Sequence, residues 1–317
     1  MSVDWEEYWS NFKSLNKLEA KVNELDDLFQ GKQSVTKTCR QIFEHYDEYL
    51  IEWENVRRAL WLKIEELPGI HLQTSRVKTL DSILRKVIEK KYERGMNPKD
   101  PYSSIDSENF KDILTDLVGI RLIISYRGKW SELHNSIMNM FPYDGNLEKY
   151  KDDAHVPHPA DGSSIMAAIP VANHAPNDNL EIFKAMNIKC KQRSSGYRSV
   201  HYVVSFMRTY VEIQTRTIYD EAWSDCDHSY VYKHNENESH PVLMELSNIL
   251  AGITNSANDL GEEMGRIFEH ESASYDEELV LMPQEDIDSI DSIYRRIEAV
   301  VHEMECFKSK IYRGKTK

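Results

Sequence analysis

The chain has 317 residues, of which 40% are hydrophobic, so it is long and apolar enough to bury a core without disulfide bridges. Its 53 acidic residues outnumber its 39 basic residues, which gives a net charge of −14. This balance excludes a surface that is basic all over, and with it sequence-independent coating of duplex nucleic acid. The length predicts about two structural units, or one domain with large appendages.

No apolar run approaches the roughly 18 residues of a membrane span. The first dozen residues also lack the basic and apolar regions of a signal peptide. We therefore expect a cytoplasmic protein that makes no membrane contact. The cysteines are scattered without a C-x-x-C pair, so we expect reduced, mostly buried thiols and no structural zinc site; they are Cys39, Cys190, Cys226 and Cys306.

Two basic islands interrupt the acidic background. Residues 71–99 carry a net charge of +5, and residues 182–211 carry +6 without a single acid. The rest of the chain then carries −25. If the two islands meet in space, they form a site for an anionic ligand; if they do not, they are solvated faces. Charge alone leaves both interpretations open.

The N-terminal third is predicted to be helical. Apolar residues recur at steps of three and four over 4–30 and 34–66, and Pro68 with Gly69 ends the second helix. A third helix is expected over 76–92, with its basic residues near its start. A short β-branched run then predicts a buried strand over 117–125, with a helix over 131–141 behind it.

The middle of the chain predicts a small sheet. Residues 142–180 are expected to form a long loop with one short strand near 165–171. Two strands joined as a hairpin follow, and three helices end the chain. The expected bounds are 199–206 and 210–216 for the strands, and 218–232, 241–270 and 285–311 for the helices. The apolar stripes of the last two helices are typical of helix pairs, most often within one chain.

The predicted fold class is α+β, a mixed β-sheet flanked by helices, with helical N- and C-terminal extensions. We expect the N-terminal extension to cover residues 1–69 and the C-terminal extension to cover 236–317. The central domain would then span residues 70–235.

One predicted strand carries an unusual set of polar side chains. With a period of two, Glu212, Gln214 and Arg216 point to the same side of the strand. Burying them is costly unless that side meets water or a ligand. Such a set could hold a magnesium ion and a phosphate together. The alternative is a half-exposed edge strand whose charges pair with each other.

Two further features could complete a site. Asp116 immediately precedes a predicted strand, and two carboxylates on neighbouring strands commonly build a magnesium site. In the segment Ser194–His201, Gly196 permits a tight turn before Tyr197, whose ring could stack on a base, and His201 could bind phosphate. Taken singly, Asp116 could be a turn residue, Tyr197 a core residue and His201 a structural residue.

Taken together and in order, these blocks resemble the synthetase domain of RelA/SpoT proteins. The resemblance covers about residues 70–235 and is greatest to the small alarmone synthetases, some of whose relatives are toxins. It rests on Ser75-Arg76-Val77-Lys78 with Ser82 and Lys86, on Asp116–Arg121, on Gly196–His201 and on Glu212–Thr217. Glu221-Ala222-Trp223, His228 and Tyr232-Lys233 look like the closing helix of that domain.

The resemblance implies a nucleotidyltransferase-like fold and a role for each matched residue. ATP would be bound by Arg76, Lys78, Ser82 and Lys86. Catalysis would involve Asp116, Glu212, Arg121 and His201, with Mg²⁺ held by Asp116 and Glu212. The acceptor would be bound by Tyr197, Arg193, Gln214 and Arg216. Arg193 and Ser195 differ from the residues common at these positions in the family, and both positions lie on the acceptor side.

Three hypotheses follow from the resemblance. The first is an enzyme that transfers the β,γ-pyrophosphate of ATP to the 3′-hydroxyl of GDP or GTP and so makes (p)ppGpp. The second keeps this chemistry but uses the 3′ end of tRNA as acceptor, in the toxin of a toxin–antitoxin pair. The third is a nucleotide sensor or interaction module without activity. The terminal helices could hold a second copy of the chain or an antitoxin.

Overall fold

The structure is a computed structural model that describes residues 4–145, 147–150, 155–176, 178–186, 188–231, 241–273 and 284–314. Tyr232 and Lys233, which the resemblance placed in the closing helix, lie outside these ranges. The eight longest described helices are α1 (Trp5–Leu15), α2 (Glu19–Leu28), α3 (Val35–Ile64), α4 (Leu80–Arg94), α6 (Trp130–Met140), α8 (Ile218–Tyr230), α10 (Pro241–Ala273) and α11 (Gln284–Gly314). Two short helices, α5 (Phe110–Ile113) and α7 (Glu181–Ala185), lie in connections.

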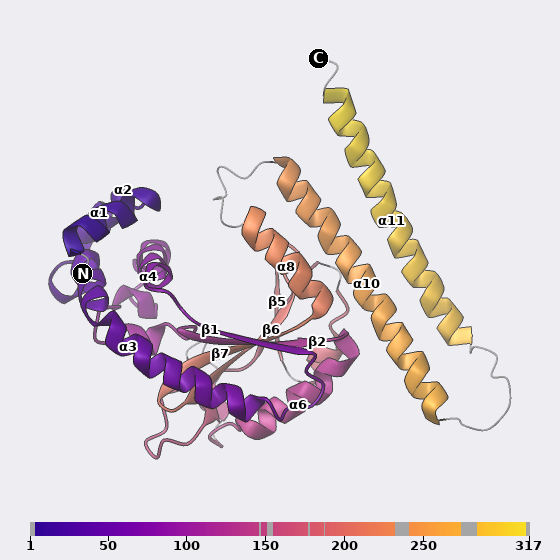
Figure 1. Ribbon diagram of the computed structural model, residues 1–317, viewed down its shortest axis with the longest axis horizontal. Helices are drawn as coiled ribbons and strands as arrows, with labels where there is room; N and C mark the ends of the chain where they lie inside the picture. The colour runs from indigo at the N-terminus through magenta and orange to yellow at the C-terminus, as the bar shows by residue number, and fades with distance from the viewer. Residues whose placement is uncertain are drawn as a thin grey trace.

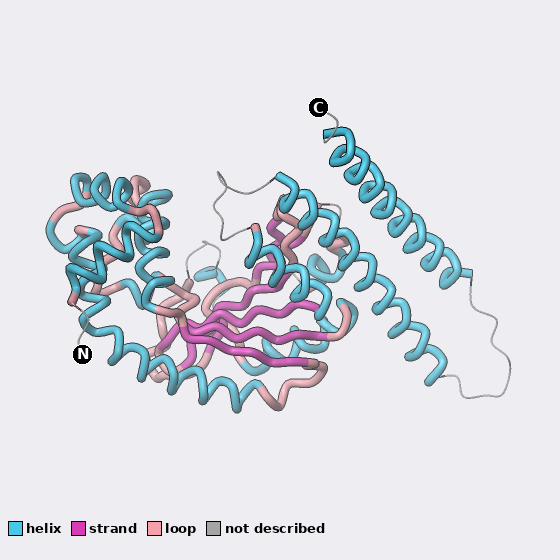
Figure 2. Tube along the Cα trace, turned by 45° about the horizontal axis from the view of Figure 1, so that its top comes forward, coloured by secondary structure: helices cyan, strands magenta, loops and turns pink. Residues whose placement is uncertain are grey.

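The centre of the molecule is one seven-stranded mixed sheet in the order β1-β2-β7-β6-β4-β5, with β3 paired to β6 (Figure 2). β2 and β7 are parallel, whereas β1 with β2 and β6 with β7 are antiparallel. The strand bounds are β1 (Leu72–Val77), β2 (Val118–Ile124), β3 (Ile165–Met166), β4 (Val171–His174), β5 (Lys189–Gln192), β6 (Ser199–Phe206) and β7 (Thr209–Thr217). The expected fold class is therefore confirmed.

Helices cover the two faces of the sheet unequally. On one face, Arg57 of α3 donates to Ser75 of β1, and His134 of α6 lies 3.1 Å from the hydroxyl of Tyr202 in β6. On the other face α8 packs beside β2 and β7, α10 packs on α8, and α11 lies outermost (Figure 1). The second face is therefore left partly open, and it carries the polar side chains of β7.

The N-terminal helices differ from the expected pattern. The single helix predicted over 4–30 is wrong, because the chain breaks between α1 and α2 at Lys17, whose φ is 55°. α1 packs on α3 through an aromatic cluster in which Trp5 stacks on Trp9 at 4.9 Å and meets Phe43 at 5.3 Å, and α2 packs beside α3 and α4. This cluster is continuous with the hydrophobic core of the sheet.

The start of α4 and the number of strands also differ from the prediction. The helix predicted over 76–92 begins only at Leu80, because Thr79 is its N-cap and accepts a hydrogen bond from the Ser82 amide. Residues 72–77 instead form the edge strand β1, so Arg76 lies in a strand. The predicted loop over 142–180 contains two short strands, β3 and β4, and not one.

All four cysteines are free, as expected, but they are not mostly buried. Cys39 is buried and Cys190 is half-buried, whereas Cys226 and Cys306 are exposed. The two exposed thiols lie on α8 and α11, outside the sheet.

Candidate active site

The register of the sheet aligns the predicted polar residues on its open face. Arg76 of β1 is paired with Gly119 of β2, and Gly119 is paired with Glu212 of β7. A Cβ atom at Gly119 would lie 3.7 Å from Cγ of Arg76, an ordinary contact distance, so the arginine stem lies directly over this glycine. This row places a cation, an open position and a carboxylate side by side.

The first half of the site is a carboxylate held between two ammonium groups. Asp116 Oδ2 accepts a hydrogen bond of 2.7 Å from Lys78 Nζ, and Oδ1 lies 2.8 Å from Lys86 Nζ. Burial alone would raise the pKa of Asp116, but the two lysines lower it to about 2. Burial and the neighbouring Lys86 lower the pKa of Lys78. Burial would also lower the pKa of Lys86, but the interactions of Lys86 with Asp116 outweigh it and raise that pKa.

These lysines come from two different elements, and the N-terminal helices support one of them. Lys78 directly follows β1, whereas Lys86 and Ser82 lie in α4. The Tyr8 hydroxyl in α1 donates to Asp81 Oδ1 in α4 at 2.5 Å, and Asn16 accepts from Arg85 one turn further along α4. α1 and Asn16 thus brace the helix that carries Lys86.

The second half of the site is a closed ring of hydrogen bonds around Glu212. His201 Nδ1 lies 3.1 Å from Glu212 Oε1, and His201 Nε2 lies 2.9 Å from the Tyr197 hydroxyl. Arg216 Nη2 donates to that hydroxyl at 2.8 Å and to Gln214 Oε1 at 2.6 Å. Gln214 Nε2 closes the ring by donating to Glu212 Oε2 at 2.5 Å.

The ring has a consistent direction. Because the Tyr197 oxygen accepts from Arg216, its own proton is free to go to His201 Nε2, which leaves Nδ1–H to donate to Glu212. Both branches of the ring therefore end at Glu212. Burial would raise the pKa of Glu212, but the hydrogen bonds from His201 and Gln214 lower it overall. A carboxylate that stays ionised at neutral pH is the group that a general base requires.

Glu221 also belongs to the site, although the sequence motifs predicted no role for it. Its Oε1 accepts from Arg121 Nη1 in β2 at 2.9 Å, and its Oε2 accepts from Arg216 Nη1 in β7 at 2.8 Å. The carboxylate on α8 therefore bridges two arginines from parallel neighbouring strands. The sequence signal for it was its position in the segment that resembles the closing helix, four residues after β7.

The structure brings most of the predicted residues together, with one clear exception. Asp116, Lys78 and Lys86 share one cluster, and Ser82 lies on the same helix as Lys86. Glu212, Gln214, Arg216, His201 and Tyr197 form the ring, and Arg121 joins it through Glu221. Arg193 instead follows β5 and donates to Asn173 of β4 at 2.7 Å, outside the ring.

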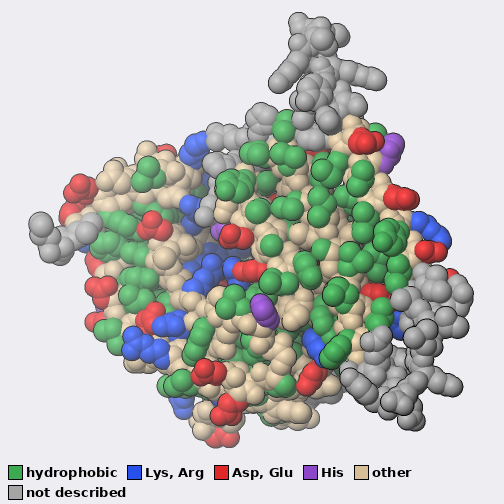
Figure 3. Space-filling model, turned by 45° about the vertical axis from the view of Figure 1, so that its right-hand side comes forward, with side chains coloured by type: hydrophobic (Ala, Val, Ile, Leu, Met, Phe, Trp, Pro, Cys, Tyr) green, Lys and Arg blue, Asp and Glu red, His purple; other side chains and the backbone are tan. Residues whose placement is uncertain are grey.

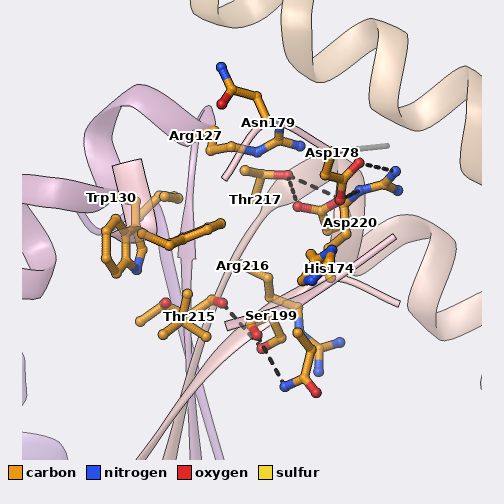
Figure 4. A pocket seen from close by; sticks show the side chains of 15 residues that line it. Arg127, Trp130, His174, Asp178, Asn179, Ser199, Thr215, Arg216, Thr217 and Asp220 are labelled. Carbon is orange, nitrogen blue, oxygen red and sulfur yellow. Dashed lines mark hydrogen bonds and ion pairs between the residues drawn. The ribbon is translucent and has the colours of Figure 1, made fainter. Parts of the chain in front are cut away.

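One face of the molecule and a cavity beside Arg216 are drawn in Figures 3 and 4. Basic side chains gather in a hollow of the surface, with acidic side chains at its rim (Figure 3). A cavity of about 40 Å³ is lined in part by Arg216 of the ring, and in it Arg198 donates to Asp178 and Thr217 to Asp220 (Figure 4). This cavity has room for very few water molecules and none for a nucleotide.

The site fits a magnesium ion only if a ligand completes the coordination. In the described part of the chain, no group of three or more His, Cys, Asp or Glu side chains could hold a metal. Asp116 Oδ1, however, is inaccessible and accepts no well-aligned hydrogen bond from any described residue, although Lys86 is near. Mg²⁺ is commonly held by one or two carboxylates together with substrate phosphates, and Asp116 with Glu212 matches that requirement.

The fold is a mixed sheet flanked by helices, with two carboxylates near basic side chains on one face, and the comparison with known families assigns its family. The family described as "Region found in RelA / SpoT proteins" matches residues 75–237, more than half of the chain. The chain therefore belongs to the RelA/SpoT family. A comparison with curated protein sequences finds no match.

Solved structures are similar at low identity. The small alarmone synthetase 1 of Bacillus subtilis is 20% identical, with 73% of this chain and 100% of that chain covered and a TM-score of 0.46. The small alarmone synthetase 2 of the same organism is 21% identical, with 71% and 99% covered and a TM-score of 0.43. A GTP pyrophosphokinase family protein from Streptococcus pneumoniae is 20% identical, with 85% and 95% covered and a TM-score of 0.37.

The described helices were also compared with the requirements of a membrane span. None of them is both long enough and apolar enough to cross a bilayer.

Proposed function

We propose that the protein is an ATP-dependent pyrophosphokinase that makes (p)ppGpp from GDP or GTP. The observation that carries this proposal is the pairing of two unlike half-sites, the Lys78–Asp116–Lys86 cluster and the ring around Glu212, in one RelA/SpoT domain. One half is cationic and suits a polyphosphate donor. The other presents a base and an aromatic ring, which suits a hydroxyl acceptor.

On the donor side, Lys78 and Lys86 would bind the phosphates of ATP, and Ser82 would assist them from the first turn of α4. Arg76, exposed on β1, would contact the adenine ring. When bound, Mg²⁺ would neutralise the charge that develops on the phosphate oxygens, and Asp116 with Glu212 would hold it.

On the acceptor side, Tyr197 would stack on the base of GDP or GTP, and Gln214 with Arg216 would position the ribose and the transferring group. Glu212 would take the proton of the 3′-hydroxyl as its oxygen forms a bond to the β-phosphorus of ATP. The bond from that phosphorus to the oxygen shared with the α-phosphate breaks, and AMP leaves with the electron pair. His201 would hold Glu212 in position through Nδ1–H.

The direct test offers radiolabelled ATP and Mg²⁺ with GDP, GTP or tRNA in parallel, and separates the products by chromatography. We expect label on the guanine nucleotides with wild-type protein, and none with Glu212→Gln. Labelled tRNA without labelled nucleotide would replace the first hypothesis with the second. Tight nucleotide binding without transfer to any acceptor would support the sensor hypothesis.

The tRNA acceptor is kept as a second candidate because of one observation. Lys184, Lys189 and Lys191 are exposed along α7 and the edge strand β5, close in sequence to the Gly196 turn. A row of cations at this edge would suit the phosphates of an acceptor stem. If tRNA is the acceptor, replacing all three lysines by Gln will weaken transfer to tRNA and make the remaining activity less sensitive to salt. Transfer to GDP or GTP should change little.

A further inference from the structure

The turn that precedes Tyr197 is covered by a helix from outside the matched family region. The Gly196 amide donates to the Arg193 carbonyl at 3.2 Å, and the φ of Gly196 is 86°, a backbone conformation that favours glycine. The tip of the turn, residues 194–195, is exposed, but Gly196 is buried. A Cβ atom at Gly196 would lie 3.1 Å from Cβ of Ala251, so α10 covers the turn at this point.

Trp223 of α8 connects the same turn to α10. Its side chain is almost fully buried, and its Nε1–H donates to the Ser247 carbonyl of α10 at 3.0 Å. Its ring would lie 3.9 Å from a Cβ atom at Gly196, and its centroid lies 6.5 Å from that of Tyr197. The hydroxyl end of Tyr197 is held by the ring around Glu212, so its backbone end depends on Trp223 and α10.

α10 is also fixed to the synthetase domain further along its length. Arg127 Nη2 donates to Asn255 Oδ1 at 3.1 Å, and Arg127 Nη1 lies 3.8 Å from Asp259 Oδ1. Gly265 faces Tyr126, and a Cβ atom at this glycine would collide with the tyrosine ring. α10 therefore lies against α8 and the end of β2 over several turns (Figure 1).

The donor half of the site is held by other elements. Lys78 follows β1, and Lys86 lies in α4, which α1 braces through Tyr8. Asp116 is paired with these two lysines. A shift of α10 would therefore reach the acceptor half of the site and leave the donor half in place.

We propose that α10 is a positioning element of the acceptor site, in which Ala251 seats the Gly196 turn and so sets the place of the Tyr197 ring. This inference rests on the proposed function, in which that ring stacks on the acceptor base. Because Ala251 is 7% exposed and packs on the turn, a larger side chain must push the turn away or lift the helix. Either movement displaces the backbone of Tyr197 while the sheet still holds its hydroxyl.

The first test is a graded series, Ala251→Ser, Ala251→Val and Ala251→Leu, with initial rates measured against ATP and against the acceptor that takes up the label. Stacking is made in the ground state and the transition state alike, so its loss should raise the KM for the acceptor and spare kcat. We expect that KM to rise about tenfold for Ala251→Leu, less for Ala251→Val, and by less than about twofold for Ala251→Ser. The KM for ATP should change by less than about twofold throughout.

Ala257→Leu makes the same change on another side of α10, so it is the matched control and should keep the wild-type constants. If Ala251→Leu loses its cooperative melting curve, Ala251→Val carries the comparison with Ala257→Val. An unchanged acceptor KM in the folded variants at residue 251, or an equal rise in both KM values, would overturn the proposal.

The second test reads the turn without catalysis. Hydrogen–deuterium exchange in peptides that cover residues 193–199 should be faster in the Ala251→Leu protein than in wild type, and unchanged in the Ala257→Leu protein. Unchanged exchange in the Ala251→Leu protein, or faster exchange with an unchanged acceptor KM, would overturn the proposal. If wild type labels no acceptor, the proposed function fails, and the exchange rates still decide whether α10 seats the turn.

Discussion

The two halves of the site hold their carboxylates in opposite ways. Asp116 meets two ammonium groups, so this half carries an excess of positive charge and leaves one carboxylate oxygen without a well-aligned hydrogen bond. In the ring, Glu212 and Glu221 balance Arg216 and Arg121, and both oxygens of Glu212 are bonded. The first half suits an anionic ligand, while the second suits neutral groups and must exchange internal hydrogen bonds for a substrate.

The largest expected effect is the loss of transfer activity when Glu212, the general base of the proposed reaction, is replaced. Glu212→Gln keeps the shape of the side chain but removes the charge that accepts a proton, so we expect transfer to fall about 10²–10⁴-fold. The initial rate at saturating ATP and acceptor measures it. Glu108→Gln, an exposed glutamate paired with Lys32, is the matched control and should keep the wild-type rate. A Glu212→Gln variant with more than about a third of that rate would exclude Glu212 as the base.

A buried lysine in α4 pairs with no carboxylate of the described residues, unlike the two lysines beside Asp116. Lys91 in α4 is only 1% exposed; its ammonium group donates to the Ile105 carbonyl at 3.2 Å and lies 4.4 Å from the centroid of the Phe29 ring. Burial lowers its pKa to about 8, whereas Asp116 raises the pKa of Lys86. We therefore expect Lys91→Met to raise the free energy of unfolding at pH 7 by about 1–3 kcal/mol.

The sign of this effect can be checked with pH. Because the pKa of Lys91 is lower in the folded than in the unfolded chain, the unfolded chain binds more protons between about pH 8 and 10.5. Wild-type stability therefore gains from this group as the pH rises, and the advantage of Lys91→Met should shrink between pH 7 and 9.5. Urea unfolding of both proteins at each pH measures the difference. A constant difference would show that the ammonium group is not destabilised by burial.

Replacing Glu221, which bridges the two arginines, should change the KM for the acceptor and not the KM for ATP. Glu221→Gln weakens the hold on Arg121 and Arg216 together, so we expect the KM for the acceptor to rise about tenfold, with little change in the KM for ATP. Ser224→Ala removes one hydrogen bond to Arg216 and leaves the bridge, so it should change the acceptor KM less than threefold. Equal changes in both KM values would mean that Glu221 supports the whole domain.

The parts of the site that lie on long strands could be predicted from the sequence, whereas contacts between distant elements could not. Glu212, Gln214 and Arg216 were placed on one side of β7 because alternation with buried Val211 and Ile213 fixes the face. β1 was missed because its polar, half-exposed residues run directly into a helix with a strong apolar stripe. The Glu221 bridge joins residues 100 positions apart, which no local pattern records.

The cationic half of the site can be tested through acid stability. Asp116 has a folded pKa of about 2 against an ordinary value of 3.8, so its contribution to stability is present above about pH 4 and is lost as the pH falls toward 2. The shift corresponds to about 2 kcal/mol. Asp116→Asn should remove this part of the pH dependence, while Asp47→Asn, an exposed aspartate of α3, should keep it. Urea unfolding between pH 6 and 3 measures the slopes; equal slopes for wild type and Asp116→Asn would mean that Lys78 and Lys86 do not hold the carboxylate in its charged form.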